Sequence, residues 1–211
     1  MRALWRNLLR YFFRLLYNEF AWSYDLVAWL VSRGRWKAWG RTALHHVRGA
    51  QVLELGHGPG HLLVTLQRRG YDPVGLDLSV NMGRQARRRL DRAGQSVPLV
   101  RARAQALPFR DGCFDTLAAT FPTGFIVDLR TLREVTRTLE ASGRLVVALG
   151  ASFVGEGLLA SFLTWLYRVT GQAEPSPNAF EPFLKEAGLS PRTVRERVGQ
   201  TTVLLVVAEK R

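Results

Sequence analysis

Three glycines at alternate positions, Gly56, Gly58 and Gly60, separate an apolar run at 51–55 from a leucine-rich helical pattern that begins at His61. A short apolar run that ends in glycines and continues into a helix is typical of a buried strand, a tight turn and a helix N-terminus. Glycine permits positive φ at such a turn and lets a ligand lie against bare backbone. The unpaired N–H groups at the start of the helix then face that ligand.

The residues around this turn restrict the kind of ligand. A dinucleotide fingerprint, G-x-G-x-x-G, requires glycine where this chain has His61. Glu54 stands two residues before the first glycine, and its carboxylate would repel a pyrophosphate but suits a cationic ligand. A second apolar run ends at Asp77, and an acidic residue at the end of the second strand is well placed to accept hydrogen bonds from two ribose hydroxyls.

From residue 51 onward, strand and helix patterns alternate. Strands are predicted at 51–55, 73–77, 97–101, 114–119, 143–149, 192–197 and 202–208, and helices at 61–70, 80–93, 128–140 and 178–187. This alternation predicts an α/β fold with a doubly wound, mostly parallel sheet of seven strands. Ligands of such sheets bind beyond the carboxyl ends of the strands, where the glycine turn and Asp77 are expected to meet.

These motifs together resemble the S-adenosylmethionine (SAM) site of class I methyltransferases, in particular those of the ubiquinone/menaquinone-biosynthesis type. Residues 77–82 (DLSVNM) resemble the family's D-x-S-x-x-M, and residues 102–115 (ARAQALPFRDGCFD) resemble its G-D-A-x-x-L-P-F-x-D-x-x-F-D. Residues 132–145 resemble its L-x-E-x-x-R-x-L-x-x-G-G-x-L. The resemblance implies a Rossmann-like fold, methyltransferase activity with SAM as cofactor and S-adenosylhomocysteine (SAH) as product, and no metal.

The resemblance also implies which residues bind the cofactor: Glu54, Gly56, His57, Gly58, Gly60, Asp77, Leu78, Met82, Ala104, Gln105 and Thr120. Met82 would pack on the adenine ring, unless it is simply a core methionine. Arg103 stands where the family usually has an aspartate that accepts from the adenine amino group, and an arginine cannot accept. Adenine recognition is therefore expected from backbone near Ala104, from Gln105 or from water.

The acceptor side is less well marked. The segment 20–25 (FAWSYD) resembles the F-x-x-x-Y-D that precedes the SAM domain in this family, which makes Tyr24 a candidate catalytic and substrate-binding residue. Its alternative role is to anchor a helix. Phe121 and Pro122, after the fourth strand, are candidate substrate-binding residues, and the D/N-P-P-Y/F motif of DNA N-methyltransferases is not found there. His57 and His61 are further candidate bases, or they simply pack or cap a helix.

Residues 1–48 are expected to form a separate helical segment before the SAM-binding domain at 49–211. Four arginines recur every fourth residue in this segment, at Arg2, Arg6, Arg10 and Arg14, beside a broad leucine and aromatic face. This pattern predicts a basic amphipathic helix that lies in a membrane interface, with a lid packed on the domain or a partner interface as alternatives. Arginines interrupt every apolar run long enough for a signal peptide or a transmembrane span. The single cysteine excludes a disulfide framework, and a cytoplasmic protein, peripheral at the inner membrane face, is expected.

The predicted function is SAM-dependent methyl transfer to a lipophilic small molecule or lipid headgroup (a quinone precursor, isoprenoid or phospholipid) at an anionic membrane surface. An apolar insertion at about 150–177 would cover such a substrate. The net charge of +13 keeps a basic nucleic-acid-binding methyltransferase as one alternative, although no RNA-binding module is visible and no nucleic-acid partner is expected. A catalytically silent interaction protein with the same fold is the other, suggested by Arg103. The oligomeric state is left open.

Overall fold

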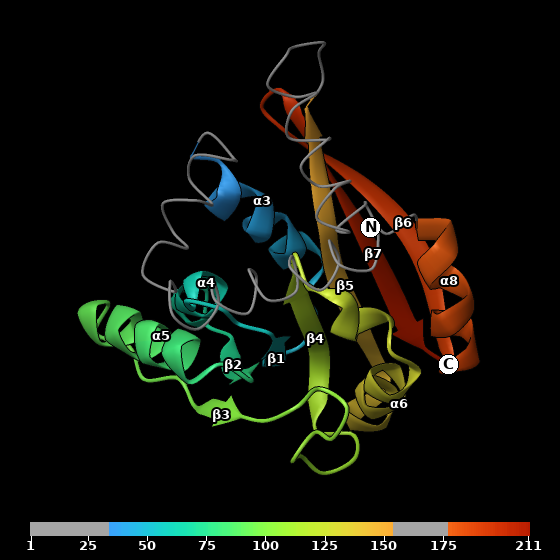
Figure 1. The fold of residues 1–211 in the computed structure, drawn as a ribbon, viewed down its shortest axis with the longest axis horizontal. Helices are drawn as coiled ribbons and strands as arrows, with labels where there is room; N and C mark the ends of the chain where they lie inside the picture. Colours follow the sequence, from blue (N-terminus) through green and yellow to red (C-terminus); the bar gives the residue numbers. More distant parts are fainter. Residues whose placement is uncertain (1–33, 154–176) are drawn as a thin grey trace, which may run out of the picture.

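The computed structural model describes residues 34–153 and 177–211 (Figure 1). The predicted basic helix, Tyr24 and nearly all of the predicted insertion at 150–177 lie outside the described residues.

The described chain forms one seven-stranded sheet in the order β3-β2-β1-β4-β5-β7-β6. Its strands are β1 (Gln51–Leu55), β2 (Asp72–Asp77), β3 (Leu99–Arg101), β4 (Phe114–Thr120), β5 (Leu139–Phe153), β6 (Leu189–Val198) and β7 (Thr201–Lys210). The first five strands pair in parallel, while β7 runs antiparallel between β5 and β6. The prediction of a mostly parallel seven-stranded α/β sheet is therefore confirmed.

Helices lie on both faces of the sheet (Figure 1). They are α3 (Trp36–Arg41), α4 (His61–Arg68), α5 (Val80–Arg92), α6 (Leu129–Thr138) and α8 (Pro177–Glu186), with short 3₁₀ turns η2 (Thr42–His46) and η3 (Gly124–Val127). Successive residues of β5 point to opposite faces. Leu145 and Val147 pack in the core beneath α6 and α8, whereas Val146 and Ala148 pack with Trp39 of α3. The sheet is thus buried on both faces, as its near-continuous apolar strands predict.

The predicted elements match the observed ones closely at the start of the domain. β1 has the predicted bounds, and α4, α5, α6 and α8 begin within a residue of their predicted starts. β5 extends four residues beyond its predicted bounds at each end, and β6 and β7 extend by one to three residues. α3 and η2 lie within residues 1–48, which were expected to be helical, whereas η3 was not predicted. None of the described helices is long and apolar enough to cross a membrane.

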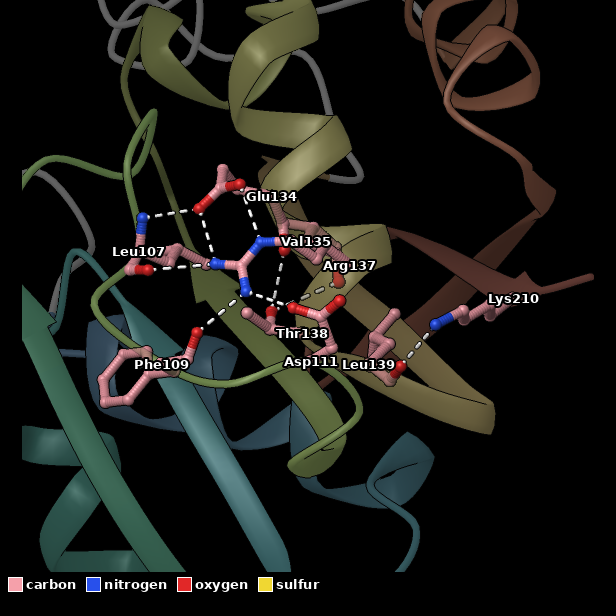
Figure 2. Close-up of polar contacts among 9 residues, drawn as sticks. All are labelled: Leu107, Phe109, Asp111, Glu134, Val135, Arg137, Thr138, Leu139 and Lys210. Atoms are coloured by element: carbon pink, nitrogen blue, oxygen red, sulfur yellow. Dashed lines mark hydrogen bonds and ion pairs between the residues drawn. The ribbon is translucent and has the colours of Figure 1, made fainter.

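The loop before β4 is held to α6 by Arg137 (Figure 2). Its guanidinium donates to the carbonyls of Leu107 and Phe109, at 3.0 and 2.8 Å, and to the carboxylates of Glu134 and Asp111. Glu134 in turn accepts from the backbone N–H of Leu107 at 2.7 Å. The hydrogen bonds from Arg137 lower the pKa of Glu134 and raise that of Arg137. This network explains why the L-P-F-x-D and E-x-x-R motifs occur together in one chain.

Candidate functional site

The glycine turn and the carboxyl ends of β1, β2 and β4 meet at one edge of the sheet. Glu54 of β1 lies in register with Gly75 of β2 and Ala118 of β4. Gly56, Gly58 and Gly60 all have positive φ, of 67°, 52° and 79°, and so adopt the left-handed conformation that glycine accepts without steric cost. The structure therefore brings together Glu54, the three glycines and Asp77, as predicted.

Asp77 is fixed in orientation by the turn that it faces. Its Oδ2 accepts from the backbone N–H of Gly58 at 2.9 Å, and its Oδ1 accepts from the N–H of Ser79 at 2.8 Å. A carboxylate has about four acceptor positions, so each oxygen keeps capacity for a further hydrogen bond. Ser79 also caps α5 by accepting from the N–H of Met82. The half-buried Asp77 carboxylate can thus accept from two neighbouring hydroxyls.

Glu54 is a buried carboxylate with an unused oxygen. Its side chain is fully enclosed, and burial raises its pKa well above 4.5, with the nearby charge of Asp77 adding to the effect. The backbone N–H of Leu63 and the hydroxyl of Thr120 oppose this shift. Among the described residues, Glu54 Oε2 has no hydrogen-bond partner. A buried acceptor without a partner is costly, so this oxygen fits a donor brought by a ligand, above all a cationic one.

The two histidines of the glycine turn differ in position. His57 is buried, and its Nδ1 lies 2.6 Å from the carbonyl oxygen of Gly58. Its ring packs against Gly75 of β2, so that a Cβ added to Gly75 would lie only 2.9 Å from Cδ2 of His57. Burial lowers the pKa of His57, which favours the neutral ring and a packing role. His61 is half-buried at the first position of α4.

The residues expected around the adenine ring differ in whether they are exposed to a ligand or buried in the core. Leu78 is 53% exposed at the rim and offers an apolar face for a planar ring. Met82 is only 1% exposed within the core side of α5, which favours the role of a core methionine. Ala104 is buried, and the amide of Gln105 donates to Asp128 Oδ2 at 3.2 Å. Asp128 itself caps α6, and hydrogen bonds from Arg130 lower its pKa to about 2.

The end of β4 carries the strained residue of the site. Phe121 has φ of 51°, a genuine outlier for a bulky side chain. It is held by its N–H, which donates to the carbonyl of Ala148 at 2.8 Å, and by Trp36, whose ring centroid lies 4.2 Å away. Pro122 follows and is half-buried. Thr120 and Phe121 therefore occupy the strand end at which the substrate residues were expected.

Two cavities adjoin this edge. The larger, of about 450 Å³, is lined at one end by His57, Asp77 and Ser79 and at the other by side chains of α5 and β3. The smaller, of about 210 Å³, lies between α3 and α4 and is closed by Thr120 and Phe121. Sequence reasoning missed the contribution of α3 to this second wall. The alternation of Trp36, Trp39 and basic residues in that stretch could have indicated an aromatic and cationic surface.

Comparisons with known proteins agree with this geometry. The methyltransferase-domain family matches residues 52–143, which include the glycine turn and Asp77. A demethylmenaquinone methyltransferase from Thermus thermophilus is 31% identical over 203 residues, which cover 84% of this chain and 92% of that protein. A ubiquinone/menaquinone biosynthesis C-methyltransferase, UbiE, from Pectobacterium carotovorum is 30% identical over 141 residues, or 63% of this chain and 56% of that protein.

Solved structures share the fold. Geranyl diphosphate C-methyltransferase from Streptomyces coelicolor, solved with SAH, superposes with a TM-score of 0.65 at 16% identity, over 82% of this chain and 79% of that one. A SAM-dependent methyltransferase from Methanococcus maripaludis gives a TM-score of 0.68 at 16% identity, over 92% and 94% of the two chains. Since the Thermus relative aligns over nearly its whole length, this chain belongs to the class I SAM-dependent methyltransferases.

Proposed function

We propose that this methyltransferase acts on a lipophilic small molecule at a membrane surface, and that it holds SAM at the edge formed by β1, β2 and β4. The acceptor would be a quinone precursor, an isoprenoid or a phospholipid. The relatives named above as demethylmenaquinone and ubiquinone/menaquinone methyltransferases support the quinone precursor. The leucine and aromatic face of residues 1–16 supports the membrane surface.

The observation that carries the cofactor site is the pairing of two unlike carboxylates at one strand edge. Asp77 is oriented by two backbone N–H groups and keeps free acceptor capacity, which suits a ribose diol. Glu54 is buried with Oε2 unpartnered among the described residues, which suits the amino group of a cationic donor. Leu78 at the rim adds an apolar surface for adenine.

Bound SAM supplies a methyl group already activated by its positive sulfur, so the chain has to align and desolvate the reactants and needs no covalent catalysis. The glycine turn presents backbone N–H groups at the start of α4. Phe121 and Trp36 form an aromatic wall at the end of β4, with their ring centroids 4.2 Å apart. Where the accepting atom must lose a proton, His61 and Tyr24 are the candidate bases, and Tyr24 lies outside the described residues.

The cofactor site is tested by calorimetric titration with SAM and SAH. Asp77→Ala should lower the affinity for both by about a hundredfold, because it removes the hydroxyl acceptor and also the carboxylate that holds the N–H of Gly58. Asp72→Ala, at the other end of β2, is the matched control, because Asp72 is exposed and its carboxylate bonds only to Gln51 among the described residues. Unchanged binding by Asp77→Ala would exclude the proposed placement of the ribose.

A further inference from the structure

The smaller cavity, between α3 and α4, is lined by residues from four parts of the fold. One face of α3 and one face of α4 form its long walls, with Arg89 of α5 and the end of β4 completing it. Among the described residues, its lining contains no acidic residue and four lysine or arginine side chains, which are Lys37, Arg41, Arg68 and Arg89.

Three of these cations lack a counter-charge within the described chain. Lys37, Arg41 and Arg68 make no ion pair with any carboxylate in residues 34–153 and 177–211, whereas Arg89 donates to the carbonyl of Pro59. Lys37 and Arg41 are four residues apart on α3, and like charges at that spacing destabilise a helix. Such an arrangement is stabilised when an anion enters between the two helices.

The cavity adjoins the proposed cofactor site at the edge of the sheet formed by β1, β2 and β4. Thr120, which bonds to Glu54, and Phe121, which stacks on Trp36, are shared between the cavity wall and the end of β4. An anionic group in the cavity would therefore lie next to the place where the methyl acceptor is expected. The aromatic pair would cover the junction between the two.

From this geometry we propose that the cavity between α3 and α4 binds a phosphate or diphosphate group of the methyl acceptor. This inference rests on the proposed function, and among the acceptors proposed there it favours an isoprenoid diphosphate or a phospholipid over the quinone precursor. A phosphate monoester carries a charge of about −1.5 to −2 at neutral pH, which matches a multiply cationic site better than a single carboxylate does. Arginine also binds phosphate oxygens in bidentate fashion. A volume of about 210 Å³ is below the ~300–1,000 Å³ of pockets that enclose whole small molecules, so only the headgroup would fit.

The first test is titration of the full-length protein with inorganic pyrophosphate. We expect saturable binding that weakens by about a hundredfold in the double variant Arg41→Gln/Arg68→Gln, at roughly tenfold for each charged hydrogen-bonding group removed. Arg41 and Arg68 are exposed, and the control Arg69→Gln/Arg92→Gln removes the same charge from two equally exposed arginines that do not line the cavity. This control should bind pyrophosphate as the wild type does. Equal loss in both double variants, or no binding to the wild type, would overturn the proposal.

A second measurement separates this proposal from the cofactor site and identifies the source of the phosphate. SAH affinity is measured in the same variants and should not change. If SAH fails to bind to the wild type while pyrophosphate binding follows the cavity arginines, the cofactor site is wrong and the anion site stands. A soluble prenyl diphosphate and vesicles of phosphatidic acid are then compared as competitors of pyrophosphate, and displacement by either supports the proposal. Faster methylation of an unphosphorylated quinol than of a prenyl diphosphate by the wild type would contradict it.

Discussion

Glu54 shows how one buried carboxylate links cofactor binding to pH. Burial, and secondarily Asp77, raises its pKa well above 4.5, so the folded protein without ligand retains a proton that the unfolded chain has already released. In this window the native state binds more protons than the unfolded state, and stability therefore falls as pH rises. The stability that Glu54 contributes is fully present below pH 4.5 and is lost as pH rises through its raised pKa.

We therefore expect Glu54→Gln, which keeps the shape and removes the titration, to have a flatter dependence of unfolding free energy on pH above about 4.5 than the wild type. Denaturant unfolding at a series of pH values measures the difference between the two proteins. In the wild type, saturating SAH should reduce the decrease of unfolding free energy with rising pH, since an amino group beside Glu54 favours its ionised form. Parallel curves for the two free proteins would show that Glu54 is already ionised in the native state.

Gly60 is required at its position for two separable reasons. It adopts φ of 79°, and a Cβ there would lie 2.9 Å from the Cβ of Ala86 on α5. Gly58 has φ of 52°, but no atom of the described residues lies within 4 Å of its Cβ position. Left-handed backbone alone costs an L-residue about 1–2 kcal/mol. Gly58→Ala should lose about that much unfolding free energy, and Gly60→Ala clearly more, because α5 must also shift. Equal losses in urea unfolding would mean that the contact with Ala86 relaxes without cost.

At the scale of elements, Arg137 on α6 holds the loop that leads into β4. Its side chain is 31% exposed and donates to two carbonyls and two carboxylates (Figure 2). Arg137→Gln should cost roughly 2–4 kcal/mol of unfolding free energy, since charged hydrogen bonds contribute about 1.5–3 kcal/mol each and exposure reduces this.

The matched control for Arg137 lies on the same helix. Arg133 is 66% exposed and pairs with Glu186 at 3.9 Å, so Arg133→Gln should cost under about 1 kcal/mol. Thermal and urea unfolding of both variants measure the difference. Similar losses would mean that the loop from Leu107 to Asp111 is held by its apolar contacts and not by the guanidinium.

Elements defined by local sequence were predictable, and those defined by distant contacts were not. β1 and α4 follow directly from the apolar run, the glycines and the leucine spacing, and Asp77 from its place at the end of β2. The extension of β5 beyond residue 149 depends on its pairing with β7, for example between Ala151 and Val203, which no local sequence pattern reveals. Likewise, Trp39 donates to the hydroxyl of Thr201, 162 residues away, so the place of α3 beside the site could not be read from its sequence.

For the same reason, the candidate site was predicted in outline and not in detail. The pairing of Glu54 and Asp77 was expected because strand ends of parallel sheets meet at one edge. The burial of Met82 and the bond from Gln105 to Asp128 depend on side-chain packing between α5, α6 and the loop after β3. The left-handed Phe121 is fixed by its contacts to Trp36 and Ala148, both remote in sequence.

At the scale of the whole molecule, positive charge is unevenly distributed along the chain. The net charge is +13, and residues 1–48 hold nine lysine and arginine residues against Glu19 and Asp25. Four of these arginines form the stripe of the predicted basic helix, beside its leucine and aromatic face. A protein charged in this way is expected to approach an anionic membrane with this segment foremost.

We therefore expect the protein to bind vesicles that contain an acidic phospholipid and to leave neutral vesicles largely in solution. Replacing Arg2, Arg6, Arg10 and Arg14 by glutamine keeps the apolar face and should weaken vesicle binding by up to about a thousandfold, at roughly 1 kcal/mol for each arginine near the surface. Sedimentation with vesicles at low and high salt measures this, and salt should weaken the wild type more than the variant because it screens exposed charges. SAH affinity should be the same in both proteins, since the cofactor edge is built from β1, β2 and β4. Equal binding to neutral and anionic vesicles, unaffected by the four substitutions, would show that the arginine stripe does not contribute to membrane binding.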